Sequence, residues 1–255
     1  MITDSYDPSS RPLVRLEDFY GEKRCLADTC LILFSREIYA HLLESFSCSQ
    51  LSEIHAANGV TPIWGFPHAG GTLAFYLSPI GSTGAAQYCI EANHLVGASR
   101  FIMFGSAGSL DAEKTAGKFV LPAEAYRDEG MSYHYAPPAN YIAIPGHKRL
   151  AEIFDELAVP YVAGRVWTTD AFLRETVAAC AARRAEGCLA VEMELAGVQA
   201  VCDFHGFALY DFLATGDVLG AEDYSPHGLQ EANHKLDKLY LALEIAKRLD
   251  QRRNP

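Results

Sequence analysis

Apolar residues along this chain form short continuous runs, and the stretches between the runs repeat apolar positions every three or four residues. The runs at 30–34 (CLILF), 100–105 (RFIMFG) and 189–193 (LAVEM) are typical of strands that are buried on both faces. Further strands are expected at 71–78, 118–121, 161–167 and 207–214.

The longer stretches between these runs have the spacing of amphipathic helices. Residues 126–146 are rich in Tyr, Pro and Asn and are expected to form an exposed loop. Because strands and helices alternate, the pattern predicts an α/β fold with a largely parallel sheet. The expected helices cover 38–46, 147–157, 173–186, about 194–204 and about 229–249.

The N-terminal residues 1–27 show no regular pattern, and we expect an irregular arm that packs on the body or on a neighbouring subunit. No repeat, low-complexity tract or Gly/Ser/Pro linker divides residues 28–255, so this segment is predicted to be one domain. A chain of 255 residues with 49% hydrophobic content can bury a sizeable core without disulfides or metals.

The net charge of -11 argues against binding to nucleic acid or to an anionic membrane, although a small anion could still bind at a local site. The seven cysteines include no C-x-x-C pair, which favours free thiols in a reducing cytoplasm and no metal site. No signal peptide and no run of 18 apolar residues is present. A soluble cytoplasmic protein without membrane or nucleic-acid partners is therefore expected.

The most informative stretch is LAVEMELAG at 189–197, where an apolar strand runs into two carboxylates and a small-residue helix. Glu192 and Glu194 flank Met193 at this junction, and ligands of α/β folds bind at the carboxyl ends of strands. Because an ionised carboxylate accepts two O–H donors, the hydroxyls of a sugar are natural partners. The alternative is that the two glutamates only place solvated charge at a helix start.

Two glycine-rich turns also follow predicted strands: GSTGAA at 81–86 and GSAGS at 105–109. Glycine allows a ligand to approach the backbone, hydroxyls can donate, and a helix start offers free N–H groups. Neither turn matches G-x-G-x-x-G or a Walker A pattern, so dinucleotide and triphosphate binding are poorly supported. Each turn, taken alone, is equally compatible with an ordinary strand–helix connection.

The last two features are TTDAF at 168–172 and TGD at 215–217. Phe172 could stack on a planar base or simply pack in the core. Asp217 is a candidate general acid, and its alternative role is in a turn or a helix cap. All five features lie at the carboxyl ends of predicted strands, and we therefore expect them to meet at one crevice.

Taken together, these five motifs resemble the nucleoside phosphorylase superfamily, which includes purine nucleoside and uridine phosphorylases and the methylthioadenosine/S-adenosylhomocysteine nucleosidases. The resemblance covers about residues 28–249, and V-E-M-E is its most specific part. It implies a single αβα domain with a mixed central sheet, part of which curls into a barrel. It also implies a homo-oligomer, either dimer or hexamer, that cleaves the N-glycosidic bond of a nucleoside. Phosphate or water is the nucleophile, and no cofactor is needed besides phosphate as co-substrate.

The resemblance also implies roles for individual residues. Glu194 would bind the ribose hydroxyls, with Met193 beneath the sugar and Glu192 beside it. Phe172 would stack on the base, and Asp217 would protonate the departing base.

The nucleophile would lie elsewhere in the same crevice. By position, Ser106 with Ala107 and Gly108 would contact the substrate and face the nucleophile. The turn of Gly81, Ser82 and Thr83 would bind phosphate.

The chain departs from the phosphorylase pattern at Met103, where phosphorylases carry an arginine. Arg36 is the substitute cation that we consider first for phosphate. Glu37 instead matches the essential glutamate of the nucleosidases, so hydrolysis is the alternative. We predict phosphorolysis, with purine favoured over uridine because Asp217 is present. A non-catalytic nucleoside-binding protein is the third hypothesis.

Overall fold

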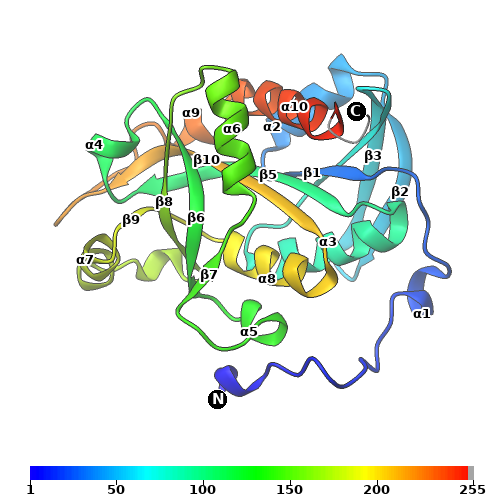
Figure 1. Ribbon diagram of the computed structural model, residues 1–255, viewed down its shortest axis with the longest axis horizontal. Helices are drawn as coiled ribbons and strands as arrows, with labels where there is room; N and C mark the ends of the chain where they lie inside the picture. The colour runs from blue at the N-terminus through cyan, green and yellow to red at the C-terminus, as the bar shows by residue number, and fades with distance from the viewer. Residues whose placement is uncertain (252–255) are drawn as a thin grey trace.

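The computed structural model describes residues 1–251, and its strands form one continuous sheet (Figure 1). The runs predicted as strands are all strands, and several extend further than expected. The strands are β1 (Thr29–Leu33), β2 (Ser49–Ala56), β3 (Gly59–His68), β4 (Gly71–Leu77), β5 (Arg100–Ser109), β6 (Phe119–Asp128), β7 (Tyr141–Ala143), β8 (Tyr161–Thr169), β9 (Cys188–Glu192), β10 (Ala208–Leu219) and β11 (Tyr224–Ser225).

Half of this sheet closes on itself. The order β10–β6–β8–β9–β5 returns to β10, because β5 pairs with β9 on one side and with β10 on the other. The other half continues from β5 through β1, β4, β3 and β2 as an open sheet. Parallel pairs such as β1–β5 and antiparallel pairs such as β5–β9 occur together. The mixed sheet and the barrel implied by the resemblance are thus confirmed.

Helices cover both faces of the sheet (Figure 1). In Figure 1, α2, α6 and α10 lie on one side and α3 and α8 on the other, which gives the αβα layering that was predicted. The helices are α1 (Glu17–Tyr20), α2 (Arg36–Ser45), α3 (Ser82–Val96), α4 (Ala112–Thr115), α5 (Ser132–Tyr135), α6 (His147–Glu156), α7 (Val177–Ala185), α8 (Leu195–His205), α9 (Leu229–His234) and α10 (Leu236–Gln251), with short 3-10 turns η1 (Ile2–Asp4) and η2 (Phe172–Arg174).

Strand β5 shows why its sequence is apolar without alternation. Phe101 and Met103 pack into the core on the α3 and α8 side, whereas Ile102 and Phe104 pack into the core on the α2, α6 and α10 side. Successive side chains of a strand point to opposite faces, and both faces here are covered by helices. A continuous apolar run is therefore what the fold requires at this position.

The structure differs from the predicted elements at two helices. The helix expected over 229–249 is interrupted at Lys235, whose extended backbone separates α9 from α10. The helix expected over 173–186 begins only at Val177, where the Thr176 hydroxyl accepts a hydrogen bond from Ala179 N–H. In both cases a local cap or break, invisible to hydrophobic periodicity, sets the boundary.

The structure of two further segments was predicted incompletely from the sequence. The hairpin β2–β3 comes from a stretch with no predicted strand, and β2 is mostly polar and exposed or half-exposed. The expected loop over 126–146 contains the end of β6, α5 and β7. Arg127 is buried there and donates to the Pro137 carbonyl at 2.6 Å and to the Ser132 hydroxyl at 2.8 Å.

The N-terminal arm contains only η1 and α1 as regular structure. Its end is packed on α3: the Tyr20 hydroxyl donates to Glu91 at 2.5 Å, and His94 Nε2 lies 2.8 Å from the Gly21 carbonyl. Within residues 1–251, no helix combines the length and apolarity that crossing a membrane would need.

Candidate active site

A cavity of about 630 Å³ opens at the carboxyl ends of β1, β5, β9 and β10. Ligands of α/β folds bind at such strand ends. Four of the five sequence motifs contribute to its lining, and the turn at 81–86 does not. The contributing predicted residues are Ser106, Ala107, Gly108, Phe172, Glu192, Met193, Glu194 and Asp217.

Glu192 ends β9 and caps helix α8. Its Oε2 accepts the N–H groups of Glu194 at 2.7 Å and Leu195 at 2.8 Å, and the Thr168 hydroxyl donates to its Oε1. Burial raises the pKa of Glu192 to about 8, and the charge of Glu194 adds to this increase. The hydrogen bonds act in the opposite direction and lower the pKa. Glu192 therefore shapes the turn that presents its neighbours.

Glu194 is the N-cap residue of α8 and is 9% exposed. Its Oε1 accepts the N–H of Gly81 at 2.6 Å. Burial raises the pKa of Glu194 to about 7, although the hydrogen bond from Gly81 works in the opposite direction. A carboxylate held in this way is preorganised for a ligand with hydroxyl donors or positive charge.

The turn at 81–86 supports the glutamates from outside the cavity. Gly81 adopts a φ of 97°, which favours glycine, and its N–H is engaged by Glu194. The Ser82 hydroxyl donates to the carbonyls of Met193 at 3.1 Å and Glu194 at 3.2 Å, while Thr83 is exposed. The structure thus places none of the three predicted phosphate ligands in the cavity lining.

Arg36 and Glu37 lie on the exposed first turn of α2 and do not belong to the residues that line the cavity. The Glu37 carboxylate lies 3.7 Å from His234 Nε2. Ser35, which caps α2, does line the cavity, and its Oγ lies 2.8 Å from His234 Nδ1. This contact joins the start of α2 to the end of α9.

Asp217 approaches the GSAGS segment closely, and this segment forms the end of strand β5 instead of the turn predicted from the sequence. A Cβ built on Gly108 would lie 3.3 Å from Asp217 Oδ2 and 2.5 Å from Leu219 Cδ1, so a larger residue would require the Leu219 side chain to move. Asp217 Oδ1 is buried and has no hydrogen-bond partner among residues 1–251. Phe172 lines the same cavity and is 56% exposed, so it is available to a ligand.

Four acidic residues of the cavity lining were missed by sequence reasoning, namely Glu175, Asp211, Glu222 and Asp223. Glu175 lies three residues after TTDAF, and burial followed by the charge of Asp217 raises its pKa to about 7. Asp211 is 1% exposed on β10, opposite Met103 in the register of β5, and neither of its oxygens has a partner within the described chain. Burial, then the charges of Glu192 and Glu194, raises the pKa of Asp211 well above its usual range. A lone aspartate inside the apolar run LYDFL was the available signal.

The missed cationic and amide residues come from α9 and α10. Asn233 accepts a hydrogen bond from the Ser106 hydroxyl. Lys238 is 1% exposed, and its ammonium donates to the Ala232 carbonyl and, at 3.4 Å, to the Asn233 carbonyl. Burial, with a smaller effect of Lys235, lowers the pKa of Lys238 to about 8.

The described lining is strongly acidic. It contains no arginine, and its only basic side chains are Lys238 and His234. Within residues 1–251, no group of His, Cys, Asp or Glu side chains could hold a metal ion. The carboxylates in the lining are Glu175, Glu192, Glu194, Asp211, Asp217, Glu222 and Asp223.

A family model described as "Phosphorylase superfamily" matches residues 29–245. The chain belongs to this superfamily. A purine nucleoside phosphorylase, DeoD-type, from Caldanaerobacter subterraneus subsp. tengcongensis is 25% identical over 240 residues, which cover 87% of this chain and 95% of the relative.

The fold is similar to that of a solved nucleosidase. The crystal structure of Campylobacter jejuni 5′-methylthioadenosine/S-adenosyl homocysteine nucleosidase superposes with a TM-score of 0.70 at 20% sequence identity, covering 87% of this chain and 99% of the nucleosidase. The predicted superfamily and its single α/β domain with a mixed sheet are confirmed. One relative is a phosphorylase and the other is a nucleosidase, so the nucleophile has to be inferred from this site.

Proposed function

We propose that this protein cleaves the N-glycosidic bond of a purine nucleoside with water as the nucleophile. The observation that carries the proposal is the shortage of cations in the cavity, whose described lining has no arginine and only Lys238 and His234 as basic side chains. This departs from the phosphorolysis predicted from the sequence and favours its hydrolytic alternative.

The shortage of free cations in the described lining opposes binding of a phosphate dianion. A desolvated dianion needs cations or several free donors. Lys238 already donates to two carbonyls, and the Gly81 N–H is engaged by Glu194. Water carries no charge and therefore needs no cation in the lining.

The same lining suits the sugar as the bond breaks. A nucleoside is neutral at the ribose, and positive charge develops on the sugar only as the glycosidic bond lengthens. Carboxylates that are already in place stabilise this charge more in the transition state than in the ground state. Glu194 is best placed to bind the ribose hydroxyls, and Glu192 holds the turn that carries it.

The opposite end of the site accommodates the base. Phe172 offers an exposed ring for stacking, and Asp217 lies within the same lining to deliver a proton. Purines gain most from such a donor because their N7 is accessible, and purine is therefore the preferred base class.

Phosphorolysis is the second candidate, and the phosphorylase relative at 25% identity favours it. In that case phosphate would have to be held without an arginine, by donors of the described lining such as Ser106, His234 and Lys238. A non-catalytic binding protein is the third, and turnover of any nucleoside would eliminate it.

The deciding experiment is base release from a panel of purine and pyrimidine nucleosides with and without phosphate. Hydrolysis gives free sugar at a rate that does not depend on phosphate. A steep rise in rate with phosphate, together with sugar 1-phosphate as the product, would overturn the proposal and establish the second candidate. Binding without release of any base would leave the third.

A further inference from the structure

Asp211 is a buried carboxyl of the cavity that has been assigned neither to the sugar nor to the base. Its side chain is 1% exposed and belongs to the cavity lining. Neither of its oxygens has a hydrogen-bond partner among residues 1–251. Because burying a carboxyl without a donor is unfavourable, such a group at a cavity wall indicates a ligand that supplies the donor.

The strand pattern shows which way Asp211 faces. The next residue, Phe212, packs into the core on the α2, α6 and α10 side, whereas Leu213 packs on the α3 and α8 side. Since side chains alternate along a strand, Asp211 faces the same side as Leu213. Glu192 and Glu194 lie at the start of α8, on this side of the sheet. Asp211 therefore faces the part of the site that carries the two glutamates.

The strand register also gives the depth of Asp211 in the cavity. β10 and β5 pair in parallel, with Asp211 opposite Met103, whereas Asp217 approaches Gly108 at the end of β5. From Met103 to Gly108 a strand rises about 16 Å. The proposed proton donor of the base and this carboxyl therefore lie at opposite ends of the site.

This separation fits the line along which the glycosidic bond breaks. The nucleophile attacks C1′ from the face opposite the departing base, so its acceptor has to lie beyond the sugar. Two hydrogen bonds and one contact between nucleophile and C1′, of about 3 Å each, account for about 9 Å between the two carboxyls. The base and the sugar carbon occupy the remainder.

Neither basic side chain of the described lining forms an ion pair with Asp211. The Lys238 ammonium donates to two main-chain carbonyls of α9, and His234 Nδ1 lies 2.8 Å from Ser35 Oγ. Asp211 is thus open to a neutral O–H donor. The sugar hydroxyls are already assigned to Glu194, and the donor that remains in the proposed reaction is water.

We propose that Asp211 binds the attacking water and takes up its proton, as the base of the hydrolysis. This inference rests on the proposed function, to which it adds the residue that binds the nucleophile. As the C1′–N bond breaks, its electron pair passes to the base, which receives a proton from Asp217. A lone pair of the water oxygen forms the C1′–O bond, and one water proton passes to Asp211. Solvent then removes the proton from Asp211 and returns one to Asp217.

The environment of Asp211 agrees with this role. Burial raises the pKa of Asp211 above its usual range, so its carboxylate holds a proton more tightly than an exposed one. A stronger proton acceptor is a better general base toward water.

Asp211→Asn tests the proposal because the amide keeps the size of the side chain and an acceptor oxygen but cannot take up the proton. We expect kcat for a purine nucleoside to fall about 10²-fold, within the usual range for general base catalysis. Turnover of 4-nitrophenyl β-D-riboside should fall to a similar extent, because water attacks the same carbon whichever group leaves. Binding of an uncleavable C-nucleoside should change less than about 3-fold, since the water and not the nucleoside contacts Asp211.

Azide provides a readout that a structural role would not move. Azide is a nucleophile that has no proton to lose, so it needs no base. In Asp211→Ala, which leaves space where the carboxyl was, azide should raise base release about 10-fold and give ribosyl azide, restoring part of the contribution of the base. Wild type should give free ribose with or without azide.

The controls test folding and the specificity of the effect. Asp155→Asn makes the same chemical change on the exposed side of α6, outside the cavity, and should behave as wild type in every assay. Asp211→Asn and Asp211→Ala remove a buried carboxyl without a partner, so neither should lower the melting temperature much.

The outcomes separate this inference from the proposed function. If wild type releases free sugar without phosphate and Asp211→Asn keeps its turnover, Asp211 is not the base and hydrolysis stands. A folded Asp211→Ala that loses turnover without rescue by azide would indicate a structural role and would also refute the inference. If wild type needs phosphate or releases no base, the proposed function itself fails, whatever the variants do.

Discussion

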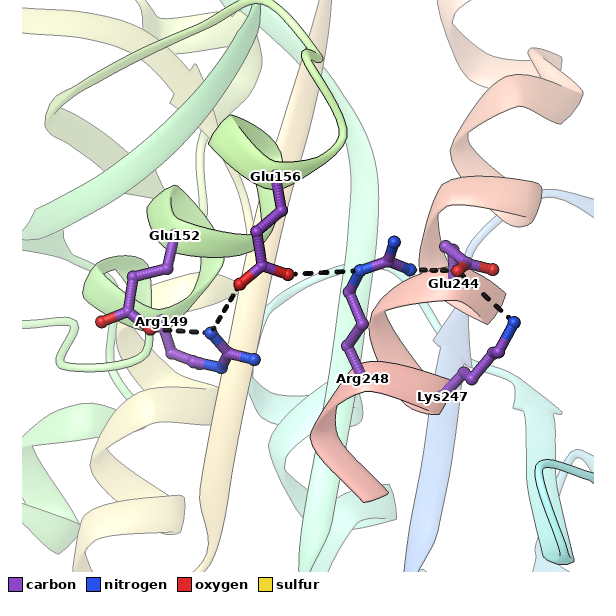
Figure 2. Close-up of polar contacts among 6 residues, drawn as sticks. All are labelled: Arg149, Glu152, Glu156, Glu244, Lys247 and Arg248. Carbon is purple, nitrogen blue, oxygen red and sulfur yellow. Dashed lines mark hydrogen bonds and ion pairs between the residues drawn. The ribbon is translucent and has the colours of Figure 1, made fainter. Parts of the chain in front are cut away.

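The carboxylates of this protein occur in two contrasting settings. Between α6 and α10, Arg248 bridges Glu156 at 3.4 Å and Glu244, and Arg149 lies 2.7 Å from Glu152 (Figure 2). These acids are at least one-third exposed. In the cavity, by contrast, Glu192, Glu194 and Asp211 are almost fully buried. Glu192 and Glu194 accept hydrogen bonds from N–H and O–H donors, whereas Asp211 has no hydrogen-bond partner within the described chain.

Their pKa values move in opposite directions. The hydrogen bond and the charge of Arg248 lower the pKa of Glu244, whereas burial raises the pKa of Glu194 to about 7. An exposed acid that faces a cation is placed for stability. A buried acid without a cation costs stability and is retained where charge must be stabilised during a reaction. The comparison therefore favours the cavity as the place of the proposed reaction.

The largest effect is expected from Asp217→Asn, which removes the donor of the proton that assists base departure. We expect kcat/KM for purine nucleosides to fall by about 10²–10⁴-fold, the usual contribution of a general acid. Rates measured on a purine nucleoside and on a substrate with a good leaving group provide the check. Equal losses on the two substrates would assign Asp217 a structural role through its close approach to Gly108 at the end of β5.

Glu194→Gln should have the next largest effect. The amide keeps the size of the side chain and the hydrogen bond from Gly81 but removes the carboxylate that we propose for binding the ribose. We expect kcat to fall by about 10²–10³-fold, the range for removing one preorganised electrostatic group, with a smaller change in nucleoside binding. Single-turnover rates and equilibrium binding measure the two parts. A folded variant with near-normal turnover would remove Glu194 from the site.

Much of the fold could be predicted because it follows from local patterns. The buried strands are continuous apolar runs, and β5 packs into the core on both faces. The break between α9 and α10 at Lys235 could not be predicted, since both helices continue the same apolar periodicity. Its consequence is functional: α9 brings Asn233 and His234 to the cavity.

The candidate site was predictable where a motif and a strand end coincide, as at Met193 and Glu194. The hydrogen bonds that the residues of a motif make could not be predicted in the same way. Gly81 and Ser82 look like an anion-binding turn in the sequence, but their donors are taken by Glu194 and by main-chain carbonyls. Likewise, nothing in the spacing of Glu175 and Asp217 indicates that β10 and the turn after β8 bring them into one cavity.

The free energy of unfolding should depend moderately on pH, and this dependence extends the comparison between buried and exposed carboxyls. The pKa values of Glu192 and Glu194 are raised to about 8 and about 7, above the value of 4.5 for an unperturbed glutamate. The unfolded chain therefore releases these protons at lower pH than the folded chain. Stability should be greatest below about pH 4.5 from this source and should decrease as pH rises through 7 and 8.

Calorimetry of the protein without nucleoside at pH 5 and pH 8 measures this decrease. We expect a melting temperature lower by roughly 5–10 °C at pH 8. The double variant Glu192→Gln, Glu194→Gln should flatten the dependence, whereas Glu113→Gln, on exposed α4, should not. A wild-type protein that is more stable at pH 8 than at pH 5 would show that these carboxyls do not dominate the balance.

The smallest effect should come from the ion pairs between α6 and α10. Arg248→Met keeps an apolar side chain of similar length but removes the charge that joins Glu156 to Glu244. Exposed pairs contribute about 1 kcal/mol or less, so we expect a melting temperature lower by at most about 4 °C. The loss of stability should shrink in high salt. Because the pKa of Glu244 is lowered, the loss should also disappear as pH falls through that lowered pKa, which is opposite to the behaviour expected of the cavity carboxyls.

Turnover should be unchanged, since none of these residues lines the cavity. Lys247→Met, which removes the cation 3.7 Å from Glu244, is the matched control. A loss of activity in Arg248→Met would mean that the two settings are coupled through α10, which also carries Lys238.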